Sequence, residues 1–343
     1  MALFKRTSLK DIADALGLSK TTVSFVLNGK ANEYHIGEAT AKRVWEMAER
    51  MQYNPNFTAI SLRDGCSKIL GIVVSDISNP FFASLARLYE DEAAKIGYTV
   101  FFGSSDEKAD KMQQVISNLI ARGVDGLIIV PCEKSEAFIA SLAPRGIPLV
   151  LLDRYFPNQD INYVALDNFE ATRQATTYIL NKGSKHPTIV AYDLDLVHMH
   201  ERIRGFEQGM ADKGTNAKGH IIRIAPDIST KDMANLLKDS MEKGTDGFMF
   251  STNLITLLGM YALRELGCPT KDIKLVGFDG TPAFDFFDSP ITYIQQPLEQ
   301  LVDASLTAVK AIIDKKQVSS ALIRGKLIEK YRKSQGRIQN HIL

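Results

Sequence analysis

Residues 8–28 constrain the fold of this chain more than any other segment, because they carry the pattern of two short helices joined by a tight turn. Ser8 is placed to cap a first helix, and Asp11 can return a hydrogen bond to the backbone of that cap. Gly17 stands where the chain must reverse, since a residue without a Cβ adopts a positive φ at little cost. Ser19 is placed to cap a second helix. The pattern predicts a helix-turn-helix, and an ordinary helical hairpin is the alternative.

The two predicted helices each have one apolar face. Ile12, Ala13 and Leu16 share a face of the first helix, and Val23 and Val26 of the second helix point back at them. In a helix-turn-helix, the second helix lies in the major groove of DNA with its N-terminal residues at the base edges. We therefore expect DNA contacts from the caps and from the outer face of the second helix, at Ser8, Ser19, Lys20, Thr21, Thr22, Ser24 and Asn28.

Two further helical segments are predicted before the pattern changes near residue 67. One runs from Glu38 to Met51 and includes Trp45, the only tryptophan, which we expect in the core of the small domain. The other, from Phe57 to Arg63, is long enough for about two turns and would be marginal alone in water. A partner copy and DNA could order it.

The composition is typical of a multidomain cytoplasmic protein. A chain of 343 residues, 45% of them hydrophobic, can form two or three domains with sizeable cores. Residues 1–63 hold nine Lys and Arg against six Asp and Glu, whereas the whole chain has a net charge of +1. The three cysteines lack metal-ligand spacing and predict reduced thiols. No apolar segment is long enough for a signal peptide or a membrane span, so we expect no membrane contact.

From Ser67 onward, short apolar strands alternate with stretches of helical length such as Phe81–Ile96 and Lys108–Arg122. This alternation is typical of doubly wound α/β domains with parallel sheets, and there are enough units for two of them. A single large α/β enzyme would show the same composition. The predicted strands are Ile69–Val74, Thr99–Phe102, Gly126–Val130, Leu149–Leu152, Thr188–Ala191, Ile221–Ile224, Gly247–Phe250 and Lys274–Gly277.

Polar and aromatic side chains come at or after the ends of these strands, where parallel sheets bind ligands. Carboxylates and amides pair with hydroxyl groups, arginines add fixed donors, and aromatic rings pack on the apolar face of a sugar. The residues that we expect to contact a small molecule are Phe81, Phe82, Ser104, Asp153, Arg154, Arg202, Asn253 and Asp279.

The sequence shows no catalytic constellation. The six histidines are scattered, and the His198-Met199-His200 spacing is a weak signal for a metal. A nucleophile elbow, a phosphate-binding glycine loop and a Cys-x-x-Cys pair are all missing from the sequence. We therefore expect no enzyme activity, no metal and no cofactor.

Three segments together resemble the lactose-repressor/galactose-repressor (LacI/GalR) family of bacterial transcription regulators: SLKDIADALGLSKTTVSFVLNG, then YNPN followed by SLR, and then GIVVSDISNPFF. The resemblance covers essentially the whole chain. It implies an all-α helix-turn-helix DNA-binding domain over residues 1–55 and a hinge helix with its linker over 56–66. Residues 67–343 would form an α/β, two-lobed effector-binding and dimerisation body with parallel sheets, of the periplasmic-binding-protein type.

The resemblance also assigns roles to individual residues. Leu62 matches a hinge leucine that wedges into the minor groove, and Ala59 matches the small residue one turn before it. We expect Asn56 and Arg63, which flank them, to contact DNA as well. Among the residues that follow the strands, Phe82, Arg154, Arg202, Asn253 and Asp279 match effector-contacting positions.

Four features depart from the family pattern. Phe25 stands where the family usually has an arginine that can bind guanine, and a phenylalanine can only press on a thymine methyl or turn into the protein. The loop from Lys30 to His35 is a few residues longer than usual, and Gly37 replaces a capping serine. Leu254 replaces an aspartate that follows the asparagine in many relatives, which changes the expected ligand chemistry.

We therefore expect a repressor-like regulator that binds a pseudo-palindromic DNA operator as a homodimer and responds to a small molecule between its lobes. A carbohydrate is the expected effector, and a nucleobase is the alternative. A solute-binding transport protein would share the body but would need a leader that Met1–Leu18 does not offer. Residues after Glu329 hold no sustained heptad, which favours a dimer over a tetramer.

Overall fold

The computed structural model describes residues 7–54, 65–214, 219–268, 273–287, 291–332 and 338–342. The chain divides into two compact units, Met1–Ser67 and Lys68–Leu343. The hinge helix and linker are expected over 56–66, and residues 56–64 of that segment, including the helical stretch 57–63, lie outside the described residues. Within the described residues, no helix is both long and apolar enough to cross a membrane.

The described part of the first unit, residues 7–54 and 65–67, contains three helices around a small apolar core. Ser8 caps α1 through the expected capping box with Asp11, Gly17 ends α1 at a φ of 65°, and Ser19 caps α2. The core holds Ile12, Ala13, Val23, Val26, Val44 and Ala48. The helices are α1 (Leu9–Leu16), α2 (Lys20–Leu27) and α3 (Glu38–Arg50).

The expectation that Trp45 lies in this core is wrong, because Trp45 is 53% exposed. Val44 and Ala48 take the core face of α3. A residue next to Val44 is rotated by about 100° around the helix axis, away from that face. Gly37 begins α3 without a side-chain cap, as its lack of a side chain requires.

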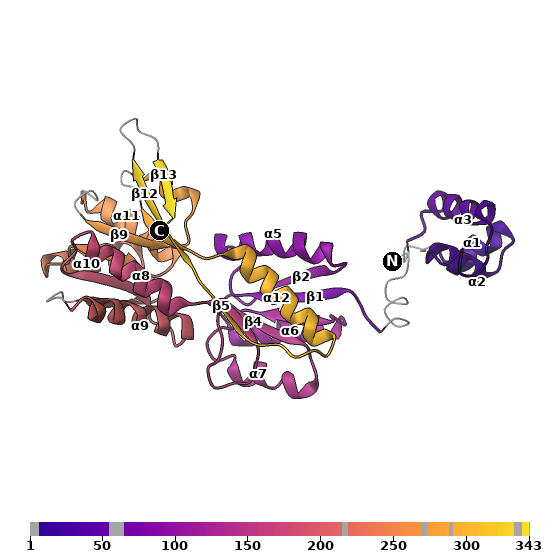
Figure 1. Ribbon diagram of the computed structural model, residues 1–343, viewed down its shortest axis with the longest axis horizontal. Coiled ribbons are helices and arrows are strands. Elements are labelled where there is room, and N and C mark those ends of the chain that lie inside the picture. Colours follow the sequence, from indigo (N-terminus) through magenta and orange to yellow (C-terminus); the bar gives the residue numbers. More distant parts are fainter. Residues whose placement is uncertain are drawn as a thin grey trace. The chain divides into compact units, whose positions relative to one another are not determined.

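The second unit has two lobes, each built on one sheet (Figure 1). Lobe 1 has a fully parallel six-stranded sheet in the order β11-β5-β4-β3-β1-β2. Helices α5 and α12 pack against one face, and α6 and α7 pack against the other. Its elements are β1 (Ile69–Val74), α5 (Pro80–Lys95), β2 (Thr99–Ser104), α6 (Ala109–Ala121), β3 (Gly126–Ile129), α7 (Glu136–Ala140), a 3-10 turn (Ala143–Arg145), β4 (Leu149–Leu152), β5 (Tyr163–Leu166), α12 (Leu298–Ile313) and β11 (Ala321–Ile323).

Lobe 2 has a seven-stranded sheet in the order β13-β12-β10-β9-β8-β6-β7. Helices α8 and α9 lie against one face, and α10 and α11 lie against the other. Its elements are α8 (Asn168–Asn181), β6 (Pro187–Tyr192), α9 (Val197–Asp212), β7 (His220–Ile224), α10 (Thr230–Glu242), β8 (Gly247–Phe250), α11 (Asn253–Glu265), β9 (Lys274–Phe278), a 3-10 turn (Pro282–Phe286), β10 (Thr292–Gln295), β12 (Lys326–Arg332) and β13 (Ile338–Ile342).

The expected parallel arrangement holds from β7 through β10, but β12 and β13 run antiparallel at the edge of lobe 2. The sequence around Ala321–Leu327 looks like one strand. The structure divides it into β11 and β12, which belong to different sheets.

The chain passes between the lobes three times, between β5 and α8, between β10 and α12, and between β11 and β12 (Figure 1). Among the described residues, side-chain hydrogen bonds also join the lobes directly. Asn253 Nδ2 donates to Asn79 Oδ1 at 3.0 Å, and the backbone N–H of Asp195 donates to Glu133 Oε1 at 2.6 Å. The residues at the strand ends of the two lobes are thereby held close to each other.

Candidate functional site

The caps of the helix-turn-helix engage three of the residues expected at DNA. Ser8 Oγ accepts from the backbone N–H of Asp11, whose carboxylate accepts in return from the Ser8 N–H at 2.7 Å. Ser19 Oγ accepts from the Thr22 N–H at 3.0 Å and lies 2.8 Å from the Thr22 hydroxyl. Ser8, Ser19 and Thr22 therefore fix the starts of α1 and α2, and their expected DNA contacts stay predictions.

The outer face of α2 holds the other expected contacts. Lys20 and Thr21 are exposed, and Ser24 and Phe25 are half-buried. Asn28 Nδ2 donates to the Ser24 carbonyl at 2.6 Å, so this amide closes the last turn of α2. The four hinge candidates, Asn56, Ala59, Leu62 and Arg63, lie outside the described residues.

Four buried charged residues follow strands or open a helix at the junction of the two lobes. We call Asp153, Arg154, Arg202 and Asp279 the interlobe charge cluster; each is at most 8% exposed. Asp153 and Arg154 follow β4 in lobe 1, Asp279 follows β9 in lobe 2, and Arg202 lies in the second turn of α9. Asp153 and Asp279 adopt positive φ angles of 66° and 50°. Non-glycine residues rarely do so, and such strain concentrates at functional sites.

Arg154 is held by the carboxylate of Glu107, which is not among the expected contacts. Its Nη1 and Nη2 atoms donate to the two oxygens of Glu107 at 2.8 and 2.7 Å, and Nη1 also donates to the Pro131 carbonyl at 3.0 Å. The Arg154 Nε atom is buried without a hydrogen-bond partner and lies 3.6 Å from Asp153 Oδ2. Arg154 is therefore neutralised within lobe 1.

Arg202 is oriented by three neighbours in lobe 2. Its Nε atom donates to Asn168 Oδ1 at 2.8 Å, Nη1 donates to the Ser251 carbonyl at 2.5 Å, and the guanidinium lies 3.7 Å from the centroid of the Phe278 ring. Burial lowers the pKa of Arg202 to about 10, although the negative charges of Asp279 and Asp153 raise it. The side chain stays cationic near neutral pH.

The two carboxylates of the cluster are poorly solvated. Burial raises the pKa of Asp279 to about 6, although Arg202 and a 2.9 Å hydrogen bond from Gln296 Nε2 favour its charged form. Burial also raises the pKa of Asp153, against the charges of Arg154 and Arg202. Because Asp153 and Arg202 belong to different lobes, this interaction links the two halves of the cluster. Both carboxylates are suited to accept hydrogen bonds from a ligand.

His198 lies beside the cluster in the first turn of α9. Burial lowers its pKa well below the usual value, and the charges of Arg154 and Arg202 lower it further. Its Nδ1 atom is buried without a hydrogen-bond partner. The side chain is therefore a neutral imidazole with one unused polar atom, and it is subject to the charges of both arginines.

The other residues expected at the effector lie differently. Phe81 and Phe82 pack edge to face in the core of lobe 1, where they are 7% and 3% exposed. Ser104 donates to Asp106 Oδ1 at 2.6 Å within its own loop. Asn253 bonds to Asn79 across the lobes. The structure thus brings together four of the eight expected residues, Asp153, Arg154, Arg202 and Asp279, and places Asn253 at the lobe junction.

Four residues around the cluster were not among the expected contacts: Glu107, Asn168, His198 and Gln296. Asn168 and Gln296 follow β5 and β10, so the rule on strand ends does point to them, although they were not chosen as contacts. Glu107 lies in the loop that follows β2. Its role becomes evident only in the folded chain, where its carboxylate binds Arg154 after β4. His198 becomes notable only through its burial between the lobes.

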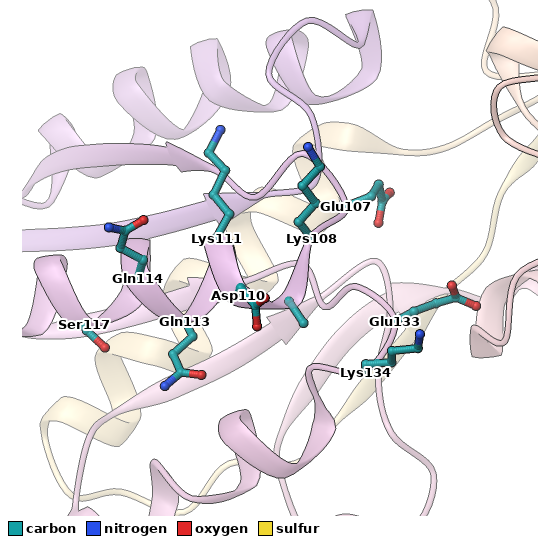
Figure 2. A pocket seen from close by; sticks show the side chains of 10 residues that line it. Glu107, Lys108, Asp110, Lys111, Gln113, Gln114, Ser117, Glu133 and Lys134 are labelled. Carbon is teal, nitrogen blue, oxygen red and sulfur yellow. The ribbon is translucent and has the colours of Figure 1, made fainter.

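A hollow of about 1080 Å³ lies over the start of α6 in lobe 1, and its lining includes Glu107, the carboxylate that holds Arg154. Glu107 and Glu133 lie at the same end of this hollow (Figure 2). Lys108, Lys111 and Lys134 line it together with acidic residues, so it has no strong preference for either charge. Among the described residues, no group of three or more His, Cys, Asp or Glu side chains could hold a metal ion.

Comparisons with known proteins agree with this architecture. Residues 8–56 match the family model of bacterial regulatory proteins of the lacI family, and residues 70–317 match that of the periplasmic binding protein domain. The ribose operon repressor of Halalkalibacterium halodurans is 30% identical over 92% of this chain and 92% of its own length. The transcriptional repressor PurR of Aliivibrio fischeri is 27% identical over 90% of this chain and 91% of its own.

The solved structure of the Lac repressor dimer bound to operator and the anti-inducer ONPF has the same fold. It superposes with a TM-score of 0.83 at 22% identity, over 95% of this chain and 98% of that chain. The family matches, the full-length relatives and the shared fold lead to one conclusion. The chain belongs to the lacI family of bacterial regulatory proteins and is a DNA-binding repressor of transcription rather than an enzyme.

Proposed function

We propose that this repressor binds its operator as a homodimer and that an uncharged polyhydroxylated molecule, such as a sugar, controls its affinity from the interlobe charge cluster. The observation that carries the proposal is the pair of buried carboxylates, Asp153 and Asp279, one in each lobe. Both are penalised by burial, and hydroxyl donors from a ligand would relieve that penalty.

The charge balance of the cluster favours a neutral ligand. Arg154 and Arg202 supply two positive charges, while Asp153, Asp279 and Glu107 supply three negative ones. Glu107 already engages Arg154 through two hydrogen bonds. A phosphate or sulfate would need surplus cationic donors. A polyol can donate to the carboxylates and accept from Arg202 and His198.

The relatives support two ligand classes. The Halalkalibacterium relative is a ribose operon repressor, whose name points to a sugar. The name of the Aliivibrio relative, PurR, points to purines, so a nucleobase is the second candidate. The paired acidic residues favour the sugar, because a pentose or hexose carries more hydroxyl donors than a nucleobase.

A thermal-shift screen tests the effector. The wild-type chain would be heated with neutral pentoses and hexoses, with their phosphorylated forms, and with nucleobases. We expect a neutral sugar to raise the unfolding temperature and its phosphate to have a smaller effect, since a ligand that binds only the folded state stabilises it. Stabilisation by nucleobases or sugar phosphates alone would overturn the sugar proposal.

Arg202→Ala and Arg204→Ala form a matched pair for this screen, because both arginines lie on α9. Arg202 is buried in the cluster, whereas the Arg204 side chain is 63% exposed and pairs with Glu201. Arg202→Ala should abolish the shift and Arg204→Ala should keep it. Equal shifts in both variants would place the ligand elsewhere.

A further inference from the structure

We propose that Tyr34, held against Phe25, is a further DNA-contacting residue of this repressor and that the aromatic pair packs on the C5-methyl group of a thymine in each operator half-site. The inference rests on the operator binding proposed above. It assigns a role to the lengthened loop between α2 and α3, which carries Tyr34.

The two rings form a close, parallel stack. Their centroids are 3.5 Å apart and their planes differ by 4°. Phe25 is half-buried, whereas Tyr34 is 46% exposed. One face of the Tyr34 ring is therefore covered by Phe25, and much of the remainder is open to solvent.

The position of Phe25 on α2 sets where this pair lies. Val23 and Val26 are buried in the core of the unit, so they define the inner face of the helix. Phe25 lies one turn after Thr21 and shares the outer face with it. In a helix-turn-helix this outer face enters the major groove. Tyr34 therefore lies next to the DNA-reading surface of α2.

The loop holds Tyr34 in a fixed place. The Lys30 N–H donates to the Phe25 carbonyl at 2.8 Å, and the Tyr34 N–H donates to the Lys30 carbonyl at 3.2 Å. The Ile36 N–H donates to the Ala31 carbonyl at 2.8 Å, and both of these residues pack against the core. A residue anchored on both sides can contact DNA at little cost in conformational entropy.

The chemistry of the pair suits thymine. An aromatic ring cannot make the bidentate contact that an arginine makes with guanine, but it packs well on the thymine methyl group in the major groove. The side chains of Ser19 and Asn28 already form hydrogen bonds with the backbone at the two ends of α2. The half-buried Phe25 and the exposed Tyr34 thus give this side of α2 an aromatic surface that can contact a base.

The experiment starts from the duplex that the full-length wild-type chain enriches from a random-sequence library. Each thymine of that duplex is then replaced by uracil, which lacks only the C5-methyl group. We expect one substitution per half-site to weaken wild-type binding about fourfold, the equivalent of one methyl group removed from an apolar contact. Since this scan uses the unaltered protein, it does not depend on the folding of any variant. Uniform affinity across the scan would overturn the proposal.

Protein variants assign the contact to Tyr34. Tyr34→Phe keeps the stack and should keep the sensitivity to uracil, whereas Tyr34→Ala should bind more weakly and lose the sensitivity at that one position. Trp45→Ala, which removes another exposed aromatic residue of the same unit, should behave like wild type. A Tyr34→Ala variant with unchanged uracil sensitivity would contradict the assignment. If no duplex is enriched at all, the proposed operator binding itself fails.

Discussion

Asp279 and His198 give the interlobe charge cluster two opposite responses to pH. The folded state raises the pKa of Asp279 to about 6, so it binds this proton more tightly than the unfolded chain does. It lowers the pKa of His198, so it binds that proton less tightly. By linkage, acidification through the pH 4–6 range stabilises the protein through Asp279 and destabilises it through His198. The two contributions have opposite signs in the wild-type chain.

The variant Asp279→Asn should separate these contributions. The wild-type carboxylate lowers the free energy of unfolding as the pH rises from about 4 to about 6, and this penalty is complete above pH 6. We expect the variant to lose that contribution, so that its free energy of unfolding falls more steeply than the wild-type value as the pH drops from 6 to 4. Urea unfolding at several pH values measures the free energy of unfolding of both proteins. Identical pH dependence in both proteins would show that Asp279 titrates normally.

The variant His198→Leu should have the opposite effect. The buried neutral imidazole makes the folded state less stable below the usual histidine pKa of 6.5. Without it, the variant should gain stability relative to wild type by up to ~1.4 kcal/mol per pH unit below that value. His200→Leu is the control, because the His200 side chain is 50% exposed. A similar gain in both variants would refute a special role for His198.

Helix α9 carries both His198 and Arg202, and its packing on α8 sets their positions. A Cβ on Gly205 would lie 2.2 Å from the Phe169 carbonyl oxygen, and a Cβ on Gly209 would lie 2.6 Å from Thr176 Cβ. The backbone carbonyl of α8 has little room to move. The two glycines, one turn apart, therefore let the helices approach closely.

Gly205→Ala should destabilise the second unit by about 1–3 kcal/mol, the usual cost of overpacking a tight interface. Because α9 must shift, the affinity for the effector should fall as well. Glu207→Ala, at an exposed position of the same helix, should change neither property. Calorimetric unfolding of the three proteins decides the matter, and a Gly205→Ala variant as stable as wild type would contradict the packing account.

The elements differ in how well the sequence predicts them. The strands from β1 to β4 and from β6 to β9 stand out because each is a short apolar run between helical stretches. β11 and β12 do not stand out in the sequence. They follow each other with only Arg324-Gly325 between them, and it is the crossing of the chain to lobe 2 at this point that places them in different sheets. Strand ends identify Asp153 and Asp279, whereas Glu107 and His198 acquire their partners only when loops and lobes meet.

At the scale of the whole molecule, we expect a dimer that does not assemble further. Residues 329–343 lack apolar heptads, and the described part of this segment forms two antiparallel strands rather than a helix. A symmetric operator requires two copies of the helix-turn-helix unit. Light scattering at micromolar concentration should report twice the chain mass of 38.1 kDa. A stable tetramer, or a monomer that binds its operator tightly, would contradict this prediction.

One titration tests most directly whether a neutral polyol at the interlobe charge cluster controls operator affinity. Fluorescence anisotropy of the enriched duplex would be followed with the stabilising sugar, for wild type and Arg202→Ala. Allosteric coupling between two sites typically changes an affinity by roughly 5–150-fold, and we expect the sugar to change the wild-type operator affinity within this range. It should leave the Arg202→Ala affinity unchanged. A wild-type affinity that no neutral sugar alters, or an equal response in the variant, would contradict the account.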